Sequence, residues 1–420
     1  MKAGINKTKI TPPAGVDLAG FGRPGRKAVG VHDDLYLSSM VIEDGGGRVL
    51  IICADLIGFG RELTASLKRE IGDRFGFSED QILLSASHTH SGPQTIENML
   101  SVGEEDEAYI EFLKEKTAAS VEKALEGMFQ ADISFGRAKC YIGVNRRRPS
   151  GGGVEFAPYE GGITDDDVTV LKVVKDGVVK AVLYNYTCHP SIVDTDFISA
   201  DYPGRAGRAI EDALGRDTAV FFIQGCCGNI RAGTVEGCKF RKGTWEDVDE
   251  YGLRLGNVVA DLCGTVLRKL DVRVSSRIST VMLPLKVLPE REKLAGILEN
   301  GTNPEKKWAG EMLSRYGGLK AELPFTVQRI SLGEAFHILA MSGEVCAEYA
   351  RYIKRKDERK VYIAAGYSNG LTGYIPTGLM LEEGGYEPKD STIYYGMPSQ
   401  FDASVEKTLK KAIDDIFKDL

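Results

Sequence analysis

Short apolar runs alternate with longer stretches in which apolar residues recur every three or four positions. RVLIICAD (48–55) precedes RELTASLKREIGDRFG (61–76), and QILLSASH (81–88) precedes DEAYIEFLKEKTAASVEKALEGM (106–128) after a loop. Later, AVFFIQGCCG (219–228) precedes WEDVDEYGLRLGNVVADLCGTVLRKL (245–270). Short apolar runs are typical of buried strands, and the three-to-four spacing is typical of helices. The pattern therefore predicts repeated strand–helix units.

One pair of runs breaks this alternation. DVTVLKVV (167–174) and VVKAVLYNYTCH (178–189) flank the turn KDG, which predicts a hairpin. Strand–helix units combined with hairpins indicate an α/β fold with two mixed β-sheets flanked by helices. We expect residues 1–420 to form a single domain, with a pair of helices inserted around 286–325 and a glycine-rich mobile loop at 150–162.

Composition and charge narrow the function. The net charge of −7 comes from interspersed acidic and basic residues, so nucleic acid is not an expected partner. The first residues, MKAGINKTKITPPAG, contain no apolar signal-peptide core, and no run approaches the ~18 apolar residues of a membrane span. We therefore expect a cytoplasmic protein with reduced cysteines and no integral membrane segment; a homo-oligomer is compatible with this sequence.

Polar side chains that could bind a ligand or take part in a reaction follow several predicted strands. In open α/β sheets, ligands bind beyond the carboxyl ends of strands, so groups from distant segments can meet in one pocket. The residues placed in this way are Asp55, His88, His189, Asn229, Glu344 and Tyr374.

Two histidines and a carboxylate are a common ligand set for a catalytic divalent metal. His88 and His90 would point the same way if the strand continued through them, so both could bind the ion, or one could move protons. The alternative is that each histidine is a hydrogen-bonded structural group. His337, inside AFHILAM, is predicted to be such a core histidine.

Six segments, in chain order, resemble the neutral/alkaline non-lysosomal ceramidase family. The strongest is SASHTHSGP, which looks like the family signature HTHSGP. The six segments are GVHDDLY (30–36), SASHTHSGP (85–93), TCHPSIVDTDFISADYPG (187–204), MSGEV (341–345), LTGYIPT (371–377) and YEPKDSTIYYG (386–396). Because they span nearly the whole chain, the resemblance is more specific than any single motif.

The resemblance implies an amidase with one catalytic Zn²⁺. The matching metal ligands are His88, His189, Glu344 and Tyr374. His90 would then handle protons near the metal, while Arg146 and Tyr386 would contact the substrate or the transition state. This chemistry suits an amide, because a zinc ion activates water and polarises the carbonyl.

The sequence departs from the family at GNIRAG (228–233), which corresponds to the family's GDVSPN. Arg231 stands in the place of a serine and Asn229 in the place of an aspartate, which favours metal-activated water over a serine nucleophile. Arg231 also adds positive charge, which favours a polar or anionic substrate. Asp55 and Asp201 are candidates for orienting ligands or substrate, or for simple strand-end caps.

The family's C-terminal immunoglobulin-like domain has no counterpart in the sequence, so the expected substrate is an N-acyl amide other than ceramide, smaller or more polar. Two other functions stay open at this stage. One is a metal-dependent esterase or phosphoester hydrolase, since the same ion activates water against other electrophiles. The other is a non-catalytic lipid- or sugar-binding protein on the same scaffold.

Overall fold

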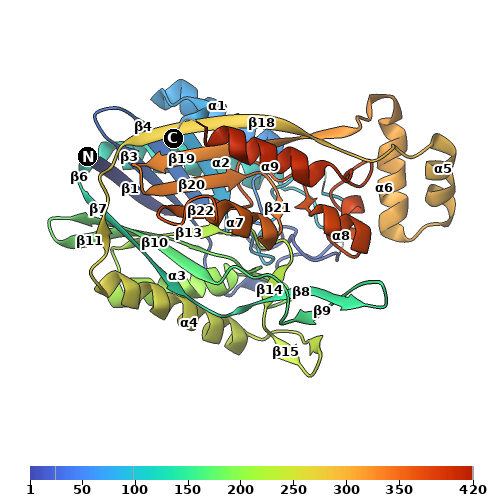
Figure 1. Cartoon of the computed structure of the whole chain (residues 1–420), viewed down its shortest axis with the longest axis horizontal. Helices are drawn as coiled ribbons and strands as arrows, with labels where there is room; N and C mark the ends of the chain where they lie inside the picture. Colours follow the sequence, from blue (N-terminus) through green and yellow to red (C-terminus); the bar gives the residue numbers. More distant parts are fainter. Residues whose placement is uncertain (24, 98, 419–420) are drawn as a thin grey trace.

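The apolar runs form the strands of a mixed α/β structure, which confirms the predicted fold class (Figure 1). The computed structural model describes residues 1–23, 25–97 and 99–418. Its strands divide among three larger sheets, where the sequence predicted two, together with smaller ribbons. The additional sheet arises because the strands before and after the helical insertion pair with each other instead of joining an earlier sheet.

Each larger sheet is mostly antiparallel. The first has the order β5-β4-β3-β1-β6 and contains β5 (Ile82–Ala86), β4 (Arg48–Ala54), β3 (Tyr36–Glu43), β1 (Lys2–Lys9) and β6 (Phe129–Gln130). The second, β13-β11-β10-β7-β17, contains β13 (Ala219–Gln224), β11 (Val178–Tyr186), β10 (Asp167–Lys175), β7 (Asp132–Lys139) and β17 (Arg268–Lys269). The third, β18-β19-β20-β22, contains β18 (Val274–Pro284), β19 (Glu322–Leu332), β20 (Phe336–Met341) and β22 (Val361–Ala365).

Each of these sheets has one parallel pair at an edge, namely β4 with β5, β11 with β13, and β20 with β22. Backbone bridges join these edges: Ser85 with Ser368 links the first sheet to the segment after β22, and Gly225 with Ala365 links the second sheet to β22. The carboxyl ends of the three pairs are therefore brought together. This is the arrangement that lets side chains from distant segments share one site.

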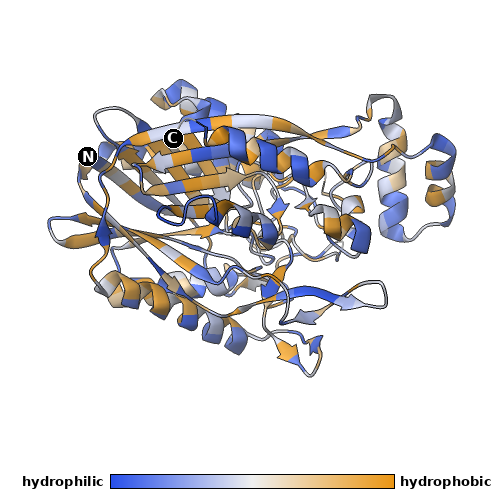
Figure 2. Ribbon diagram, viewed as in Figure 1, coloured by the Kyte–Doolittle hydropathy of each residue, from blue (hydrophilic) through white to orange (hydrophobic). Residues whose placement is uncertain are grey.

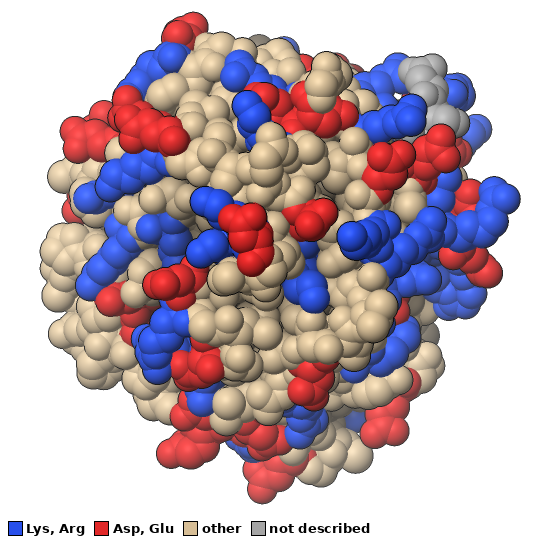
Figure 3. All heavy atoms as spheres, turned by 90° about the vertical axis from the view of Figure 1, so that its left-hand side faces the viewer, with Lys and Arg blue, Asp and Glu red and all other residues tan. Residues whose placement is uncertain are grey.

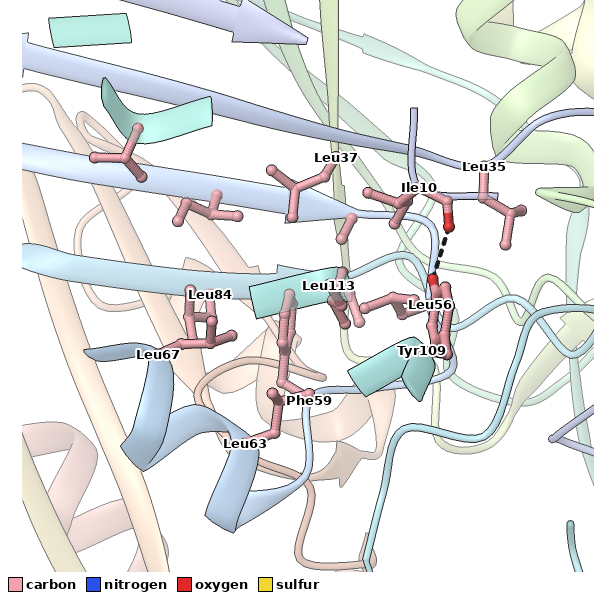
Figure 4. Packing of buried hydrophobic residues seen from close by; sticks show 14 of the residues in the cluster. Ile10, Leu35, Leu37, Leu56, Phe59, Leu63, Leu67, Leu84, Tyr109 and Leu113 are labelled. Atoms are coloured by element: carbon pink, nitrogen blue, oxygen red, sulfur yellow. Dashed lines mark hydrogen bonds between the residues drawn. The ribbon is translucent and has the colours of Figure 1, made fainter. Parts of the chain in front are cut away.

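Helices cover the outer faces of the sheets and bury apolar stripes. Figure 4 shows Leu63 and Leu67 of α1 (Arg61–Phe75) and Leu113 of α2 (Glu107–Glu126) packed against residues of the first sheet such as Leu84. Tyr109 satisfies its buried hydroxyl by donating a hydrogen bond to the Ile10 carbonyl at 2.8 Å. Helices α3 (Asp201–Leu214) and α4 (Trp245–Gly264) pack against the second sheet, and α7 (Ala347–Lys354) and α9 (Val405–Ile416) against the third.

The segment between β18 and β19 holds α5 (Arg291–Asn300) and α6 (Asn303–Ser314), which stand beside the main body in Figure 1.

The predicted hairpin is also present, because β10 and β11 pair in antiparallel register.

The prediction of a mobile loop at 150–162 is wrong. This segment contains β9 (Gly153–Tyr159), which pairs with β8 (Gly143–Ser150). Gly151 and Gly152 adopt φ of +54° and +93° and form the tight turn between the two strands, so these glycines mark a hairpin.

The surface and the cysteines agree with the composition. Lys and Arg are interspersed with Asp and Glu on the face shown in Figure 3. The interior strands are strongly apolar, whereas β8 is hydrophilic (Figure 2). The eight cysteines are unpaired, and all but Cys238 are buried. Within the described ranges, no helix combines the length and the apolar character that a bilayer crossing requires.

Candidate metal centre

His88 lies just beyond the first parallel pair. Its backbone has φ +67°, in the left-handed region, so β5 does not continue through it, and the condition under which His88 and His90 would share one face of a strand is not met. Two bonds to the loop after β4 hold this conformation: the His88 N–H donates to the Leu56 carbonyl at 2.9 Å, and Nδ1 donates to the Ile57 carbonyl at 2.6 Å. Because a carbonyl only accepts, Nδ1 carries the proton and Nε2 presents a lone pair.

His189 is oriented in the same manner beyond the second parallel pair. Its Nδ1 donates to the carbonyls of Cys227 and Ile230, at 2.7 and 3.0 Å. Complete burial and the nearby Arg146 lower the pKa of His189 to about 4, so the imidazole is neutral at pH 7. Its Nε2 is then a second free lone pair.

Glu344 and Tyr374 come from the short parallel ribbon of β21 (Glu344–Val345) and β23 (Tyr374–Ile375), in which they are register partners. Glu344 Oε2 lies 3.0 Å from His189 Nε2 and 3.3 Å from His88 Nε2. The Tyr374 hydroxyl lies 3.4 Å from His189 Nε2. Burial raises the pKa of Glu344, but the adjoining histidines outweigh that effect and hold the pKa well below its ordinary value.

His90 completes what we call the histidine cluster, which consists of His88, His90 and His189. The ligand atoms of the three lie within 4.8 Å of one another, and His90 Nε2 is 3.2 Å from His88 Nε2. The His90 N–H donates to the Pro190 carbonyl at 3.1 Å, which ties the two histidine loops together. Gly20 packs directly on His90, and a Cβ there would lie 2.5 Å from the imidazole ring, so only glycine fits.

The nitrogen and oxygen atoms of this centre are better suited to binding a divalent cation than to hydrogen-bonding with one another. Two imidazole nitrogens with free lone pairs point at one carboxylate oxygen, an arrangement that requires a proton or a cation between them. The lowered pKa of His189 disfavours the proton. Imidazole, carboxylate and phenol oxygen are ligand types that Zn²⁺ accepts, and ring nitrogens held by backbone carbonyls are typical of metal sites.

Two tyrosines at this centre were missed by the sequence analysis. The Tyr367 hydroxyl donates to Glu344 Oε2 at 3.2 Å, and the Tyr395 hydroxyl donates to Glu344 Oε1. Tyr367 is buried beside the His88 ring, with ring centroids 4.2 Å apart, and the Tyr395 ring contacts that of Tyr374, with centroids 6.0 Å apart. Tyr367 follows β22 directly and has φ +52°, so its position after a buried strand was an available signal. Tyr395 belongs to a segment already noted for its resemblance, but nothing in its spacing distinguishes it.

Arg146 and Tyr386 lie beside Tyr374. The Arg146 guanidinium carbon is 5.4 Å from the Tyr374 ring centroid and 5.6 Å from that of Tyr386. Arg146 Nε donates to Glu387 at 2.8 Å, and Arg147 also binds this buried carboxylate. Burial lowers the pKa of Arg146, but Tyr374 and Glu387 outweigh it and raise the pKa well above its ordinary value. Glu387 was a further omission of the sequence analysis.

Asn229 and Arg231 follow β13, on either side of Ile230, whose carbonyl accepts a hydrogen bond from His189. The Asn229 side chain accepts from the Ala347 N–H at 2.8 Å and donates to Glu348, so it anchors the start of α7. Arg231 lies in β14 (Ile230–Ala232), and its backbone forms a parallel bridge with His189.

Asp55 and Asp201 are directed elsewhere. Asp55 accepts from the Tyr36 N–H at 2.9 Å, and Asp201 accepts from the N–H groups of Ile192 and Tyr202 at 3.0 and 2.7 Å. Within the described part of the chain, neither carboxylate bonds to the histidine cluster. Both line a separate cavity of about 450 Å³, together with Asp33, which we call the acidic cavity.

A second cavity, of about 920 Å³, lies between the α5–α6 helices and residues 386–402. Tyr386 belongs to its lining and also contacts the ring of Tyr374, with ring centroids 5.4 Å apart. Apolar side chains on its walls include Ile297, Trp308 and Ile393. This cavity therefore reaches the residues that surround the histidine cluster.

Comparison with known proteins gives consistent results. A family profile described as "Neutral/alkaline non-lysosomal ceramidase, N-terminal" matches residues 1–235. The neutral ceramidase of Mycobacterium tuberculosis is 23% identical over 217 residues, which cover 47% of this chain and 33% of that protein. Neutral ceramidase A of Dictyostelium discoideum is 29% identical over 86 residues, which cover 20% of this chain and 12% of that protein. The matches therefore span a third or less of the curated relatives.

Solved structures extend the likeness to the whole chain. The crystal structure of neutral ceramidase from Pseudomonas aeruginosa superposes with a TM-score of 0.78 at 19% identity, over 99% of this chain and 73% of that one. A structure titled "Ceramidase complexed with C2" gives a TM-score of 0.77 at 18% identity, over 99% and 74% of the two chains. At this level of identity the likeness establishes a shared fold.

Proposed function

This chain belongs to the neutral/alkaline non-lysosomal ceramidase family, and on that premise we propose that it is a zinc-dependent hydrolase of N-acyl amides. Residues 1–420 would act as one catalytic domain that carries the α5–α6 insertion. The observation that carries the proposal is the approach of His88 Nε2 and His189 Nε2 to Glu344 Oε2, at 3.3 and 3.0 Å, with both nitrogens offering lone pairs.

The proposed metal ligands are His88, His189, Glu344 and Tyr374. A bound zinc ion would supply a Lewis acid that acidifies water and polarises a carbonyl. The backbone carbonyls of Ile57 and Cys227 fix the two imidazoles in the tautomer that binds a cation. Tyr367 and Tyr395 hold both oxygens of Glu344 and thereby fix the carboxylate.

His90 is the proposed proton carrier. Burial, together with the neighbouring His88 and His189, lowers its pKa well below the ordinary value, so the ring is neutral and able to accept a proton. In the reaction, the oxygen of water bonds to the amide carbonyl carbon while His90 takes the proton. The carbon–nitrogen bond then breaks and His90 returns that proton to the leaving amine, which gives a carboxylic acid and an amine.

Arg146 and Tyr386 are the proposed substrate contacts. Arg146 Nη2 is buried without a hydrogen-bond partner, although Nε binds Glu387. A free N–H of a buried guanidinium can stabilise the negative charge that develops on a carbonyl oxygen during attack. Tyr386 stands between this group and the second cavity, where apolar side chains would accept an acyl chain.

The decisive experiment combines metal analysis with a substrate panel. Purified protein should contain about one zinc per chain, and it should hydrolyse N-acyl amides, from a panel in which ceramide is one member, faster than matched esters and phosphoesters. Removal of zinc with a chelator should abolish turnover, and added zinc should restore it. Protein that binds no metal would favour a binding function, and preferential cleavage of esters or phosphoesters would identify one of the other hydrolases.

A further inference from the structure

Arg231 is a half-buried cation without a counter-ion. Its Nε is shielded from solvent and has no hydrogen-bond partner. Among the described residues no carboxylate forms an ion pair with it, and burial together with the like charge of Arg146 lowers its pKa. Since an uncompensated buried charge is unfavourable, such a group is unusual unless a ligand completes it.

The neighbouring arginines are paired. Arg147 binds Glu387 and Glu383, at 2.6 and 3.0 Å, and Arg146 binds Glu387 at 2.8 Å. Among the guanidinium groups of Arg146, Arg147 and Arg231, the carboxylates of Glu387 and Glu383 balance two, which leaves one positive charge in excess. That excess resides on Arg231, because it makes none of these contacts.

Arg231 is also close to the metal centre. Its backbone bridges to that of His189, and the preceding carbonyl, of Ile230, accepts from His189 Nδ1. The guanidinium carbons of Arg231 and Arg146 lie 6.0 and 5.1 Å from the centroid of one ring, that of Phe156. The two guanidinium groups therefore lie on the same aromatic ring, and a substrate group bound to Arg231 would be about one aromatic side chain away from Arg146.

Aromatic contacts hold Arg231 in place without neutralising it. Phe240 of β16 (Lys239–Phe240) lies on it at 5.0 Å, in addition to Phe156. Cation–π contacts of this kind stabilise a guanidinium only modestly. They also fix the plane of the group, which prepares its N–H donors for a planar, two-oxygen acceptor such as a carboxylate.

We propose that Arg231 binds a carboxylate of the substrate, so that the preferred substrates are N-acyl amides with an anionic group near the scissile bond. This inference rests on the proposed amidase function. The carboxylate can belong to the amine half, as in an N-acyl amino acid, or to the acyl half, as in a dicarboxylic acid monoamide. Both present the same chemistry to Arg231.

The test compares substrates that differ only in charge. N-lauroylglycine and N-lauroylethanolamine share the acyl chain and the amide, and N-dodecylsuccinamic acid carries its carboxylate on the acyl half, close to the amide carbonyl. Arg231→Leu should lower kcat/KM for a carboxylate substrate by about 10- to 100-fold, the worth of a charge-assisted hydrogen bond, and leave N-lauroylethanolamine within about threefold. The anionic substrate that loses rate shows which half carries the group.

Arg148→Leu is the matched control. It removes the same charge from the neighbouring strand β8, where Arg148 pairs with Glu155 at 2.6 Å, and should leave the selectivity unchanged. Arg231→Lys should recover part of the preference, because it keeps the charge. Thermal melting confirms that each variant is folded, and Arg231→Gln replaces the leucine variant if that protein does not fold. An equal loss on charged and neutral substrates would overturn the proposal.

A binding measurement separates this inference from the amidase proposal. The ketone isostere of N-lauroylglycine, in which a methylene replaces the amide nitrogen, cannot be hydrolysed. Calorimetry should show that Arg231→Leu weakens its binding by about 10- to 100-fold. If no amide is turned over but this dependence remains, the proposed chemistry fails and the anion site stands. If amides are turned over but neither the kinetic preference for an anionic substrate nor this binding depends on Arg231, the anion site fails alone.

Discussion

The metal centre and the acidic cavity both gather polar side chains from separate segments of the chain. In the acidic cavity, Asp55 follows β4 and Asp201 begins α3. Their oxygens accept from backbone N–H groups, and Asp33 accepts from Ser199 Oγ and the Ala200 N–H. These carboxylates therefore act on the polypeptide itself, by fixing the loops around them.

In the metal centre, by contrast, only part of each side chain's hydrogen-bonding capacity is used on the backbone. His88 and His189 use one nitrogen each to bind the backbone and leave the other directed at Glu344. The carboxyl groups of the two sites also differ in their pKa. Burial raises the pKa of both Asp55 and Asp201 to about 7, so a large share of each group is still protonated at neutral pH, whereas the pKa of Glu344 is held well below its ordinary value. A site is thus distinguished from a structural cap by donor or acceptor capacity left unused within the protein.

Loss of a metal ligand should have the largest effect. We expect His88→Ala and His189→Ala to retain almost no zinc, because each removes one of the paired nitrogens, and activity should fall to background. Metal content by elemental analysis and turnover of an N-acyl amide are the two readouts. His337→Ala is the control, since that histidine is buried in β20 against Ser331, as predicted, and should keep the metal. Normal zinc content in the His88 variant would refute the assignment.

His90 should separate binding from chemistry. If His90 carries protons without being a ligand, His90→Ala keeps about one zinc per chain while kcat falls by about 100- to 10,000-fold. Its Nε2 lies close enough to His88 for a metal role, so zinc content decides between the two functions. Loss of zinc in this variant would instead assign His90 as a third imidazole ligand.

A Tyr367→Phe variant tests whether the residues that hydrogen-bond to the metal ligands contribute to metal affinity. Tyr367→Phe removes the hydroxyl that donates to Glu344, and metal affinity should fall by about 10- to 100-fold, as is usual for partners of metal ligands. Competition with a fluorescent chelator measures this affinity. Tyr349→Phe is the matched control, because its hydroxyl donates to the Pro376 carbonyl, at a distance from the histidine cluster. Equal affinities in the two variants would remove Tyr367 from the site.

Asp55 should affect stability and leave the metal unchanged. In the unfolded chain it ionises near its ordinary pKa of 3.8, but in the folded protein only near 7, so unfolding releases a proton between these values. The free energy of unfolding therefore falls as pH rises from about 4 to about 7, by about 2–4 kcal/mol for this group. Asp55→Asn should remove that part of the slope in urea denaturation and keep full zinc content. A slope equal to that of the native chain would contradict the raised pKa.

Much of the fold and part of the site were accessible from the sequence. The alternation of apolar runs and amphipathic stretches predicted the α/β class, and the KDG turn predicted the β10–β11 hairpin. Hydrophobic periodicity is local, so it identifies elements but not which strands pair across the chain. That is why three larger sheets appear where two were expected.

The site residues divide in the same way. His88, His189, Glu344 and Tyr374 lie in motifs and follow strands, and the structure brings their polar atoms together. Asp55 has the same placement in the sequence but faces the acidic cavity. Tyr395 and Glu387 carry no local signal of their roles, because their partners Glu344 and Arg146 lie 51 and 241 residues away. Tyr367 follows a buried strand, which was a signal of position but did not identify Glu344 as its partner.

By itself, the sequence determined most of the strands and helices, which histidines follow strands, and that Arg231 adds a positive charge where the family has a serine. The tertiary structure decided which lone pairs converge and which polar groups remain unsatisfied. The physical reason is that hydrogen bonds and ion pairs depend on distances of about 3 Å between atoms, and these distances are fixed only when three separate sheets are joined at their edges.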